Sequence, residues 1–184
     1  MATALSNLQP LRWVHNSRGV PARVETYPEG TSETFKTGDL VTFDLSEDGL
    51  VSLPMTSGVP TSDRFLGIAM TDASGTAGTA IDVLIPQPDD VFSAAIASAV
   101  DTAIAPLPDH RGALYAVILM DSSNNSVYAV YTTGTEWVKV FGYDRQDAAR
   151  RGIDPWGQSW TGTAGDRVYF SFLTSCLDAI GQES

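Results

Sequence analysis

The sequence predicts a mainly β protein: a single compact β-barrel or sandwich domain of short antiparallel strands. Three observations support this prediction. A Gly-Asp turn that opens an alternating apolar strand occurs twice, at residues 35–43 and 163–170. Short apolar segments separated by Gly, Pro, Asn, Asp and Ser fill the chain between these two phrases. Charged residues make up 18% of the chain, and abundant Thr, Ser, Ala and Gly favour strands and turns over long exposed helices.

Each predicted strand is bounded by turn-forming residues. In chain order the strands lie at residues 19–26, 35–45, 50–53, 65–70, 81–85, 113–120, 127–132, 137–141 and 168–173. Residues 27–30 read as a turn, and residues 47–49 and 121–125 read as hairpin loops. Gly67 interrupts an apolar strand, which indicates a bulge or the close approach of another backbone.

Residues 90–105 fit two different structures. A helical stripe is formed by Phe92, Ala95 or Ile96, Ala99 and Ala103, with Asp89 or Asp90 as the N-cap. One side of a strand is formed instead by Val91, Ser93, Ala95 and Ala97. The spacing slightly favours one short helix, whereas the surrounding strands favour the second structure. Pro106 and Pro108 end either element.

The N-terminal residues differ in composition from the remainder of the chain. Residues 1–10 are small and polar with scattered Leu, and the apolar side chains of Leu11, Trp13 and Val14 follow. We therefore expect an extended N-terminal arm at residues 1–14 and a β-rich domain at residues 15–184. Leu11 and Trp13 would anchor such an arm on a partner; a frayed terminus is the alternative.

Charge and composition exclude several classes of partner. The net charge is −11 and the pI is near 4.3, so the surface repels nucleic-acid phosphates and anionic membranes. We therefore expect no nucleic-acid partner and no membrane partner. The N-terminus lacks the pattern of a signal peptide, which predicts a cytosol-like compartment. The one cysteine, Cys176, lies in an apolar run and is expected to be a buried thiol.

Catalytic and metal-binding patterns are not evident in the sequence. His15 and His110 lie in loop-like surroundings, and with Cys176 they are too few and too scattered for a zinc site. We therefore expect no enzyme activity, no cofactor and no metal. A hydrolase using His110 stays open as an alternative. A second alternative is a glycan-binding platform of Trp156 and Trp160, with Trp137 assigned to the core.

Three stretches together resemble the small head proteins of tailed bacteriophages, the decoration or cement class. The first stretch is residues 35–41. The second is residues 64–69, followed by a small-residue loop, residues 81–86 and residues 90–92. The third runs from residues 137–142 through a long loop to residues 167–172. The resemblance covers most of residues 35–173 and rests on the order and spacing of turns and strands. It also favours a strand at residues 91–97.

The resemblance implies a β-barrel-like domain on the outside of a capsid, where it stabilises contacts between coat subunits. The implied partner is the major capsid protein, and self-association is expected as a trimer or dimer. The implied location is the virion exterior, with the host cytoplasm during assembly. We expect partner contacts at Leu11, Trp13 and Val14, and in the loop at residues 54–62, through Pro54, Met55, Val59 and Pro60. The alternatives are a surface glycan-binding module of a virion and a minor head–tail structural protein.

Overall fold

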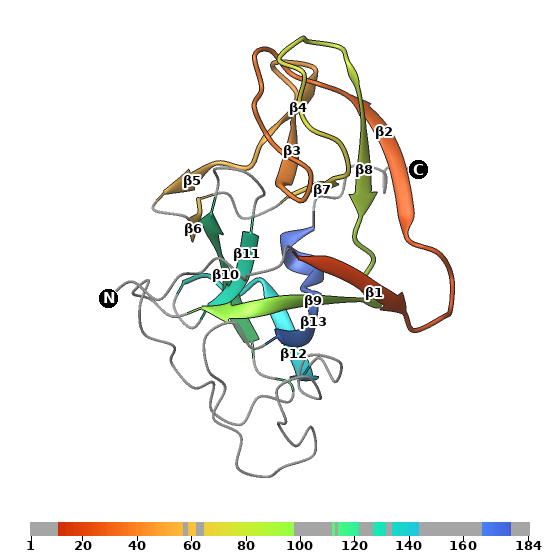
Figure 1. Cartoon of the computed structure of the whole chain (residues 1–184), viewed down its shortest axis with the longest axis vertical. Helices are drawn as coiled ribbons and strands as arrows, with labels where there is room; N and C mark the ends of the chain where they lie inside the picture. Colours follow the sequence, from red (N-terminus) through yellow and green to blue (C-terminus); the bar gives the residue numbers. More distant parts are fainter. Residues whose placement is uncertain are drawn as a thin grey trace.

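The computed structural model describes residues 11–56, 59–61, 65–97, 112, 114–121, 127–131, 134–143 and 167–177. Within these residues the chain is mainly β, which confirms the predicted fold class. The described residues form two larger sheets and one short hairpin. Figure 1 shows the larger sheets one above the other along the long axis of the molecule. No helix among these residues is long and apolar enough to cross a membrane.

The first sheet closes into a small barrel. Its strands are β1 (Arg12–Asn16), β9 (Asp90–Ala97), β10 (Leu114–Asp121), β11 (Val127–Tyr131), β12 (Val138–Tyr143) and β13 (Arg167–Phe172). The strand order is β1-β9-β11-β10-β12-β13. β13 also pairs with β9, so the five strands β9, β11, β10, β12 and β13 form a closed ring. β9 and β11 run parallel, and the other pairs are antiparallel. β1 pairs with the first half of β9.

The second sheet is antiparallel and nearly closed. Its order is β2-β8-β7-β3-β4, with β2 (Arg23–Pro28), β3 (Leu40–Asp44), β4 (Gly49–Ser52), β7 (Gly67–Ala69) and β8 (Ala80–Ile85). A single bridge between Glu29 and Leu50 brings the end of β2 to β4, on the opposite edge of the sheet. A separate hairpin is formed by β5 (Met55–Thr56) and β6 (Val59–Pro60).

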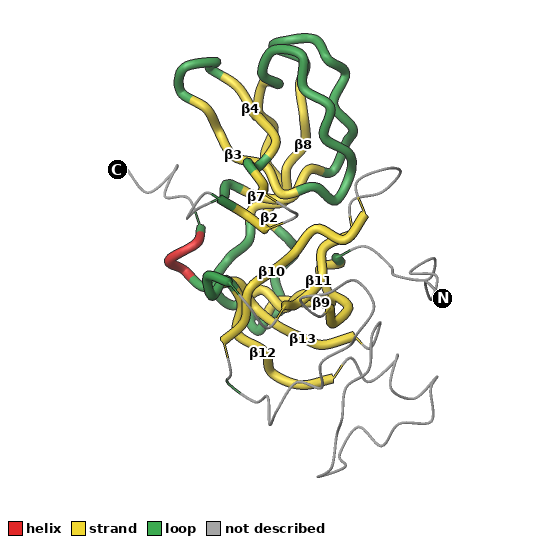
Figure 2. The backbone as a smooth tube through the Cα atoms, turned by 90° about the vertical axis from the view of Figure 1, so that its left-hand side faces the viewer, coloured by secondary structure: helices red, strands yellow, loops and turns green. Residues whose placement is uncertain are grey.

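One core cluster joins the two sheets. Leu40, Ile68 and Leu84 of the second sheet pack with barrel residues that include Phe92 and Phe170. A smaller cluster fills the interior of the second sheet and contains Phe35, Val41, Leu50, Leu66, Ala69, Ile81, Val83 and Ile85. Figure 2 shows the second sheet stacked on the barrel, where the joining cluster lies. The two sheets therefore share one buried interface, as expected for a compact β domain.

The ambiguous segment at residues 90–105 contains a strand. β9 spans Asp90–Ala97 and pairs with β1, β11 and β13, so its backbone groups are used in sheet hydrogen bonds. The helical alternative is therefore wrong for residues 90–97, and residues 98–105 lie outside the described part. Among the described residues, helical backbone is confined to a 3-10 turn at Thr174–Cys176.

Several local boundaries differ from the sequence-based prediction. The strand expected at residues 35–45, for example, begins at Leu40 and ends at Asp44. The strand expected at residues 19–26 begins at Arg23 and continues to Pro28. Glu29 is buried and bridges Leu50, so the turn expected at residues 27–30 lies further along, at Thr31 and Ser32. The side chain of Glu29 binds a distant loop, and this long-range contact keeps the chain extended where the local sequence favours a turn.

Candidate partner-contact surface

The apolar residues expected in an N-terminal arm belong to the β domain. Leu11 is 7% exposed and lies in the core that joins the two sheets, and Trp13 packs against the same core. Both side chains therefore contribute to the folding of this chain, and Leu11 is not free to anchor on a partner. The expected boundary after residue 14 falls inside β1. Residues 1–10 lie outside the described part.

β1 contains an irregularity at Val14. Trp13 pairs with Phe92 and His15 pairs with Val91, so Val14 is an extra residue in the ladder. Such a β-bulge bends an edge strand and changes the direction of its side chains. Val14 is half-buried and His15 is exposed. Of the three contact candidates in this region, Trp13 and Val14 therefore keep some accessible surface.

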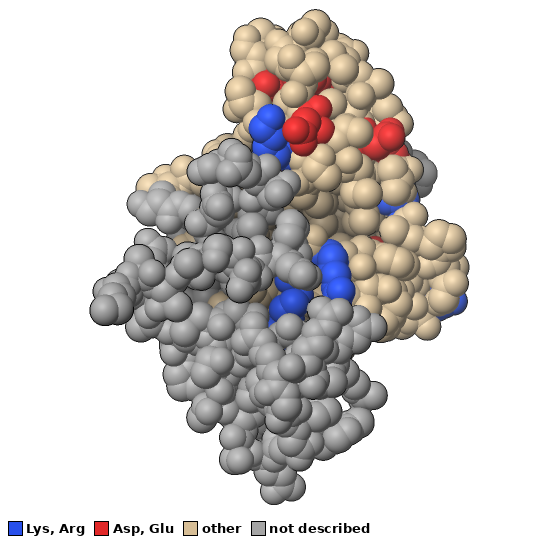
Figure 3. Space-filling view, in the orientation of Figure 1, with Lys and Arg blue, Asp and Glu red and all other residues tan. Residues whose placement is uncertain are grey.

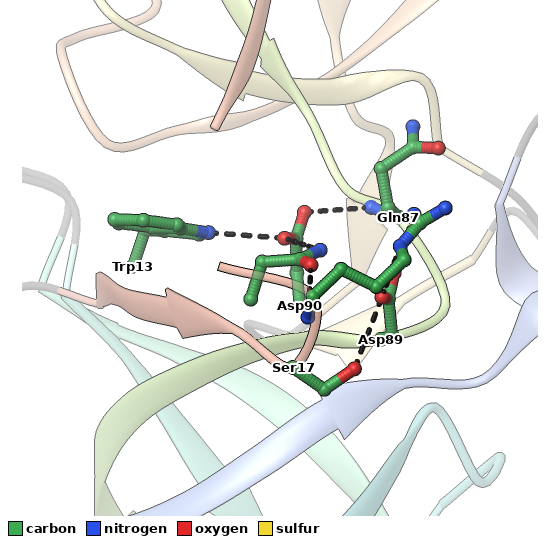
Figure 4. A network of polar contacts seen from close by, with 7 residues as sticks. Trp13, Ser17, Gln87, Asp89 and Asp90 are labelled. Atoms are coloured by element: carbon green, nitrogen blue, oxygen red, sulfur yellow. Dashed lines mark hydrogen bonds and ion pairs between the residues drawn. The ribbon is translucent and has the colours of Figure 1, made fainter. Parts of the chain in front are cut away.

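The side chain of Trp13 is held by a buried carboxylate. Its indole Nε1 donates a hydrogen bond of 3.1 Å to Oδ1 of Asp90, the first residue of β9 (Figure 4). Asp90 is 1% exposed, and it also accepts from Nδ2 of Asn16 at 2.9 Å and from the backbone N–H of Gln87 at 2.8 Å. Three neutral donors thus satisfy a carboxylate that burial would otherwise penalise.

A second carboxylate holds the far end of β1. Asp89 accepts hydrogen bonds from the hydroxyl of Ser17 at 3.1 Å and from Nε and Nη2 of Arg18 at 2.7 Å and 3.0 Å. The hydrogen bond from Arg18 holds the pKa of Asp89 below its usual value. This pair is exposed to solvent, so its contribution to stability is small. The two consecutive carboxylates fix the position of β1 on the start of β9.

The other predicted contact residues lie in the β5–β6 hairpin. Pro54 is exposed, whereas Met55 and Pro60 are half-buried, and Met55 packs against the joining core. The backbone N–H of Thr61 donates to the carbonyl of Pro54 at 2.9 Å, which closes the base of the hairpin. Val59 pairs with Thr56 in the ladder. In Figure 1 this hairpin lies on the left and β1 runs toward the right.

The structure also exposes large apolar side chains that the sequence did not single out. In the described part they are Val20, Val24, Leu45, Met70, Leu114 and Phe141. Val24 pairs with Leu84, which is buried between the two sheets, yet Val24 is 50% exposed because β2 is an edge strand. Leu45, in the turn after β3, is 85% exposed. A Leu between Asp44 and Ser46 in a hairpin turn is the sequence signal that could have found it.

Acidic side chains are concentrated around the second sheet. Between residues 23 and 89 the described part contains ten carboxylates and two cationic side chains. The carboxylates belong to Glu25, Glu29, Glu33, Asp39, Asp44, Glu47, Asp48, Asp72, Asp82 and Asp89. Figure 3 shows acidic groups in red on this upper part of the molecule, and basic groups in blue mostly toward the barrel. This surface would favour a basic partner surface over an acidic one.

The described residues contain one thiol, Cys176, and one histidine, His15. Cys176 is buried, its Sγ donates to the carbonyl of Leu173 at 2.8 Å, and burial raises its pKa to about 12. His15 lies exposed on β1. The described residues contain no group of three His, Cys, Asp or Glu that could hold a metal ion. His110 lies outside the described part.

The aromatic residues of the glycan-binding alternative are only partly described. Trp137 is 1% exposed and stacks on Phe65 with ring centroids 5.3 Å apart, which confirms its assignment to the core. Trp156 and Trp160 lie outside the described residues.

No family model matches the chain, and neither the curated proteins nor the solved structures contain a match.

Proposed function

We propose that the chain is a structural protein of a phage virion that binds the outer surface of the capsid. Its partner is the major capsid protein, and its role is to stabilise contacts between neighbouring coat subunits. The observation that carries this proposal is the order and spacing of the three stretches that resemble head decoration proteins. The compact β fold is consistent with a protein that works through a surface.

The physical chemistry of such a role fits the charge of the chain. A cement protein gains binding energy only when the capsid lattice has assembled its composite site. A net charge of −11 keeps the free protein soluble and dispersed until that site exists. The carboxylates around the second sheet then favour a coat surface that presents Lys and Arg.

The contact residues of the proposal are those that keep accessible surface. They are Trp13 and Val14 on β1, and Pro54, Met55 and Pro60 in the β5–β6 hairpin. Leu11 is omitted because it fills the core. Since β1 begins at Arg12, an arm deletion that leaves the fold intact must end at residue 10.

The test is a pelleting assay with purified undecorated capsids of the phage that encodes the chain. Light scattering gives the oligomeric state of the free protein, for which we expect a trimer or dimer. Saturable co-sedimentation at a fixed ratio to the coat subunit would support the proposal. A protein that remains in the supernatant with capsids of every maturation state would overturn it. Binding at about a dozen copies per particle would indicate a minor head–tail protein instead.

Variants separate the two candidate contact regions. Val14→Ser tests β1, where Val14 is half-buried, and replacing both Pro54 and Pro60 with Ser tests the hairpin. His15→Ala, an exposed change on β1 outside the contact set, is the matched control. We expect the control to bind like the wild type, and at least one of the two test variants to lower capsid occupancy at equal protein concentration.

A further inference from the structure

Glu29 is a buried carboxylate bound by a loop that lies far from it in the sequence. It is 1% exposed at the end of β2. Oε2 accepts from the backbone N–H of Ser74 at 2.9 Å and from the Ser74 hydroxyl at 2.8 Å, and Oε1 accepts from the N–H of Gly75 at 2.6 Å. The N–H of Thr76 donates to the hydroxyl oxygen of Ser74 at 3.1 Å. All of these donors are neutral.

The loop at residues 73–79 is shaped around this carboxylate. Successive backbone N–H groups that point to one anion form a nest, a conformation that requires positive φ at some positions. Gly75 and Gly78 have φ of 78° and 81°, which glycine adopts without steric cost. The backbone of Glu29 is bound as well: its N–H donates to Thr79 at 2.8 Å, and its carbonyl accepts from Gly78 at 2.7 Å.

The same residue closes the second sheet. Glu29 forms the bridge to Leu50 that brings the end of β2 to β4, and the N–H of Gly30 donates to the Leu50 carbonyl at 2.8 Å. The backbones meet closely here, since a Cβ on Gly49 would lie 2.7 Å from the nitrogen of Gly30. Glu29 therefore lies where three segments meet: its side chain and backbone bind the loop at residues 73–79, and its backbone bridges the end of β2 to β4.

The charged groups on the surrounding elements bind other partners. On the segments beside Glu29, Glu33 accepts from the N–H and hydroxyl of Ser52, and Glu47 accepts from the N–H of Thr31. At the start of the loop, Asp72 accepts from Thr37 and pairs with Lys36.

The carboxylates on the strands β2 and β8 also bind groups other than Glu29. Glu25 on β2 binds Arg23 and Tyr27, and Asp82 on β8 accepts from Thr26. The ionisation of Glu29 therefore depends mainly on its own burial and on the N–H and hydroxyl groups of the loop. Burial raises the pKa of its carboxyl, but the hydrogen bonds from Ser74 and Gly75 outweigh it and leave the pKa below the usual value.

We propose that Glu29 is an acid-sensitive latch whose protonation frees the loop at residues 73–79, while the barrel stays folded. A protonated carboxyl presents an O–H toward backbone donors and can no longer accept from all of them. The pKa of the Glu29 carboxyl is lower in the folded state than in the unfolded state. The latch is therefore closed at pH values above the unfolded-state pKa and opens as the pH falls through the folded-state pKa. Thus the latch stays closed at neutral pH.

The experiment is amide hydrogen exchange of the full chain, measured by NMR from pH 7 to pH 3 and expressed as protection relative to an unstructured peptide. We expect the N–H groups of Ser74 and Gly75 to lose protection by about tenfold or more as the Glu29 carboxyl titrates. The N–H groups of Phe92 and Phe170, in the barrel, should keep theirs over the same interval.

A variant and a matched control test the role of the charge. Glu29→Gln keeps the shape but places an amide NH₂ against the backbone donors, so Ser74 and Gly75 should be poorly protected already at pH 7. Glu33→Gln makes the same change at a half-buried carboxylate that also binds a backbone N–H and a Ser hydroxyl. It should leave Ser74 and Gly75 unchanged.

Two outcomes would overturn the latch. The loop amides could stay protected after Glu29 is protonated, or the barrel amides could lose protection at the same midpoint, as in global acid unfolding. If Glu29→Gln fails to fold, the wild-type titration still decides, because it compares the ¹³C shift of the Glu29 carboxyl directly with the loop amides. Neither outcome bears on capsid binding at neutral pH, so the latch and the proposed function are tested independently.

Discussion

Gly67 in β7 marks the closest approach between two strands of the second sheet. A Cβ at this position would lie 2.4 Å from the carbonyl oxygen of Leu84 and 2.5 Å from Cγ1 of Val83. Both distances are shorter than real Cβ contacts, and the first involves backbone that cannot rotate away. The glycine inside an apolar strand therefore indicated a close backbone approach correctly.

We expect Gly67→Ala to lower the free energy of unfolding by about 3 kcal/mol, because β7 and β8 must separate to accept the methyl group. Gly78→Ala is the control: Gly78 has a φ of 81° but no atom within 4 Å of a Cβ, so only backbone strain of about 1 kcal/mol applies. Urea unfolding measures both variants. Equal losses for the two would show that the steric contact at Gly67 does not control stability.

The thiol of Cys176 gives a second prediction at the scale of the single residue. Its pKa is raised to about 12, so the unreactive protonated form dominates in the folded protein at pH 8. We expect modification by a disulfide reagent at pH 8 to be at least about tenfold slower in buffer than in 6 M urea. Because the pKa of the thiol is raised in the folded state, the thiol contributes to stability at pH values below its unfolded-state pKa. This contribution is lost as the pH rises toward 12. Rapid labelling in buffer would contradict the burial of the thiol.

At the scale of the element, β9 shows why sequence pattern alone left a helix and a strand open. Phe92, Ala94 and Ile96 line the core, but Ser93 and Ala95 on the other face are also 0% and 1% exposed. A strand buried on both faces lacks the alternation between polar and apolar residues that identifies a half-buried strand. Small residues on the second face then fit a helical stripe equally well.

β1 was missed for a different reason. Its first residues were assigned to an arm on composition, and the strand exists because it pairs with β9, 77 residues away at the contact between Trp13 and Asp90. No local pattern encodes such a pairing. The hairpins of β3 with β4 and of β10 with β11 were predicted because their pairing is local and their turn residues are specific.

The hydrogen bond between Trp13 and Asp90 can be tested within β1. Trp13→Phe keeps an aromatic ring against the core but removes the Nε1 donor, leaving a buried carboxylate with one donor fewer. We expect a loss of about 1–2 kcal/mol in the free energy of unfolding. His15→Ala, exposed on the same strand, should change it by less than about 0.5 kcal/mol.

A double-mutant cycle isolates the contact. When Asp90→Asn is present, Trp13→Phe should cost less, because the indole N–H no longer meets a charged acceptor. An interaction free energy of zero between the two changes would show that Trp13 stabilises β1 by packing alone.

At the scale of the whole molecule, the shared core decides whether the two sheets unfold together. Phe65 lies in the connection that enters β7, yet it stacks on Trp137 at 5.3 Å and meets Phe172 of β13 edge-on at 4.7 Å. Its backbone N–H donates to the carbonyl of Cys176, which follows β13. The second sheet is therefore built onto the barrel through side chains and backbone alike. The sequence predicted one compact barrel or sandwich domain but could not show that a small barrel and a second sheet are joined in it.

We expect one cooperative thermal transition, in which the calorimetric enthalpy equals the van't Hoff enthalpy. Phe65→Ala removes a ring from the shared core, and Phe35→Ala removes one from the core of the second sheet alone. Each should cost about 3–5 kcal/mol. In a cooperative molecule both variants lower the single midpoint, and the fluorescence of Trp137 in the barrel follows the unfolding of the second sheet in both. If Phe35→Ala instead produced an early transition that leaves the fluorescence unchanged, the second sheet would unfold as an independent unit.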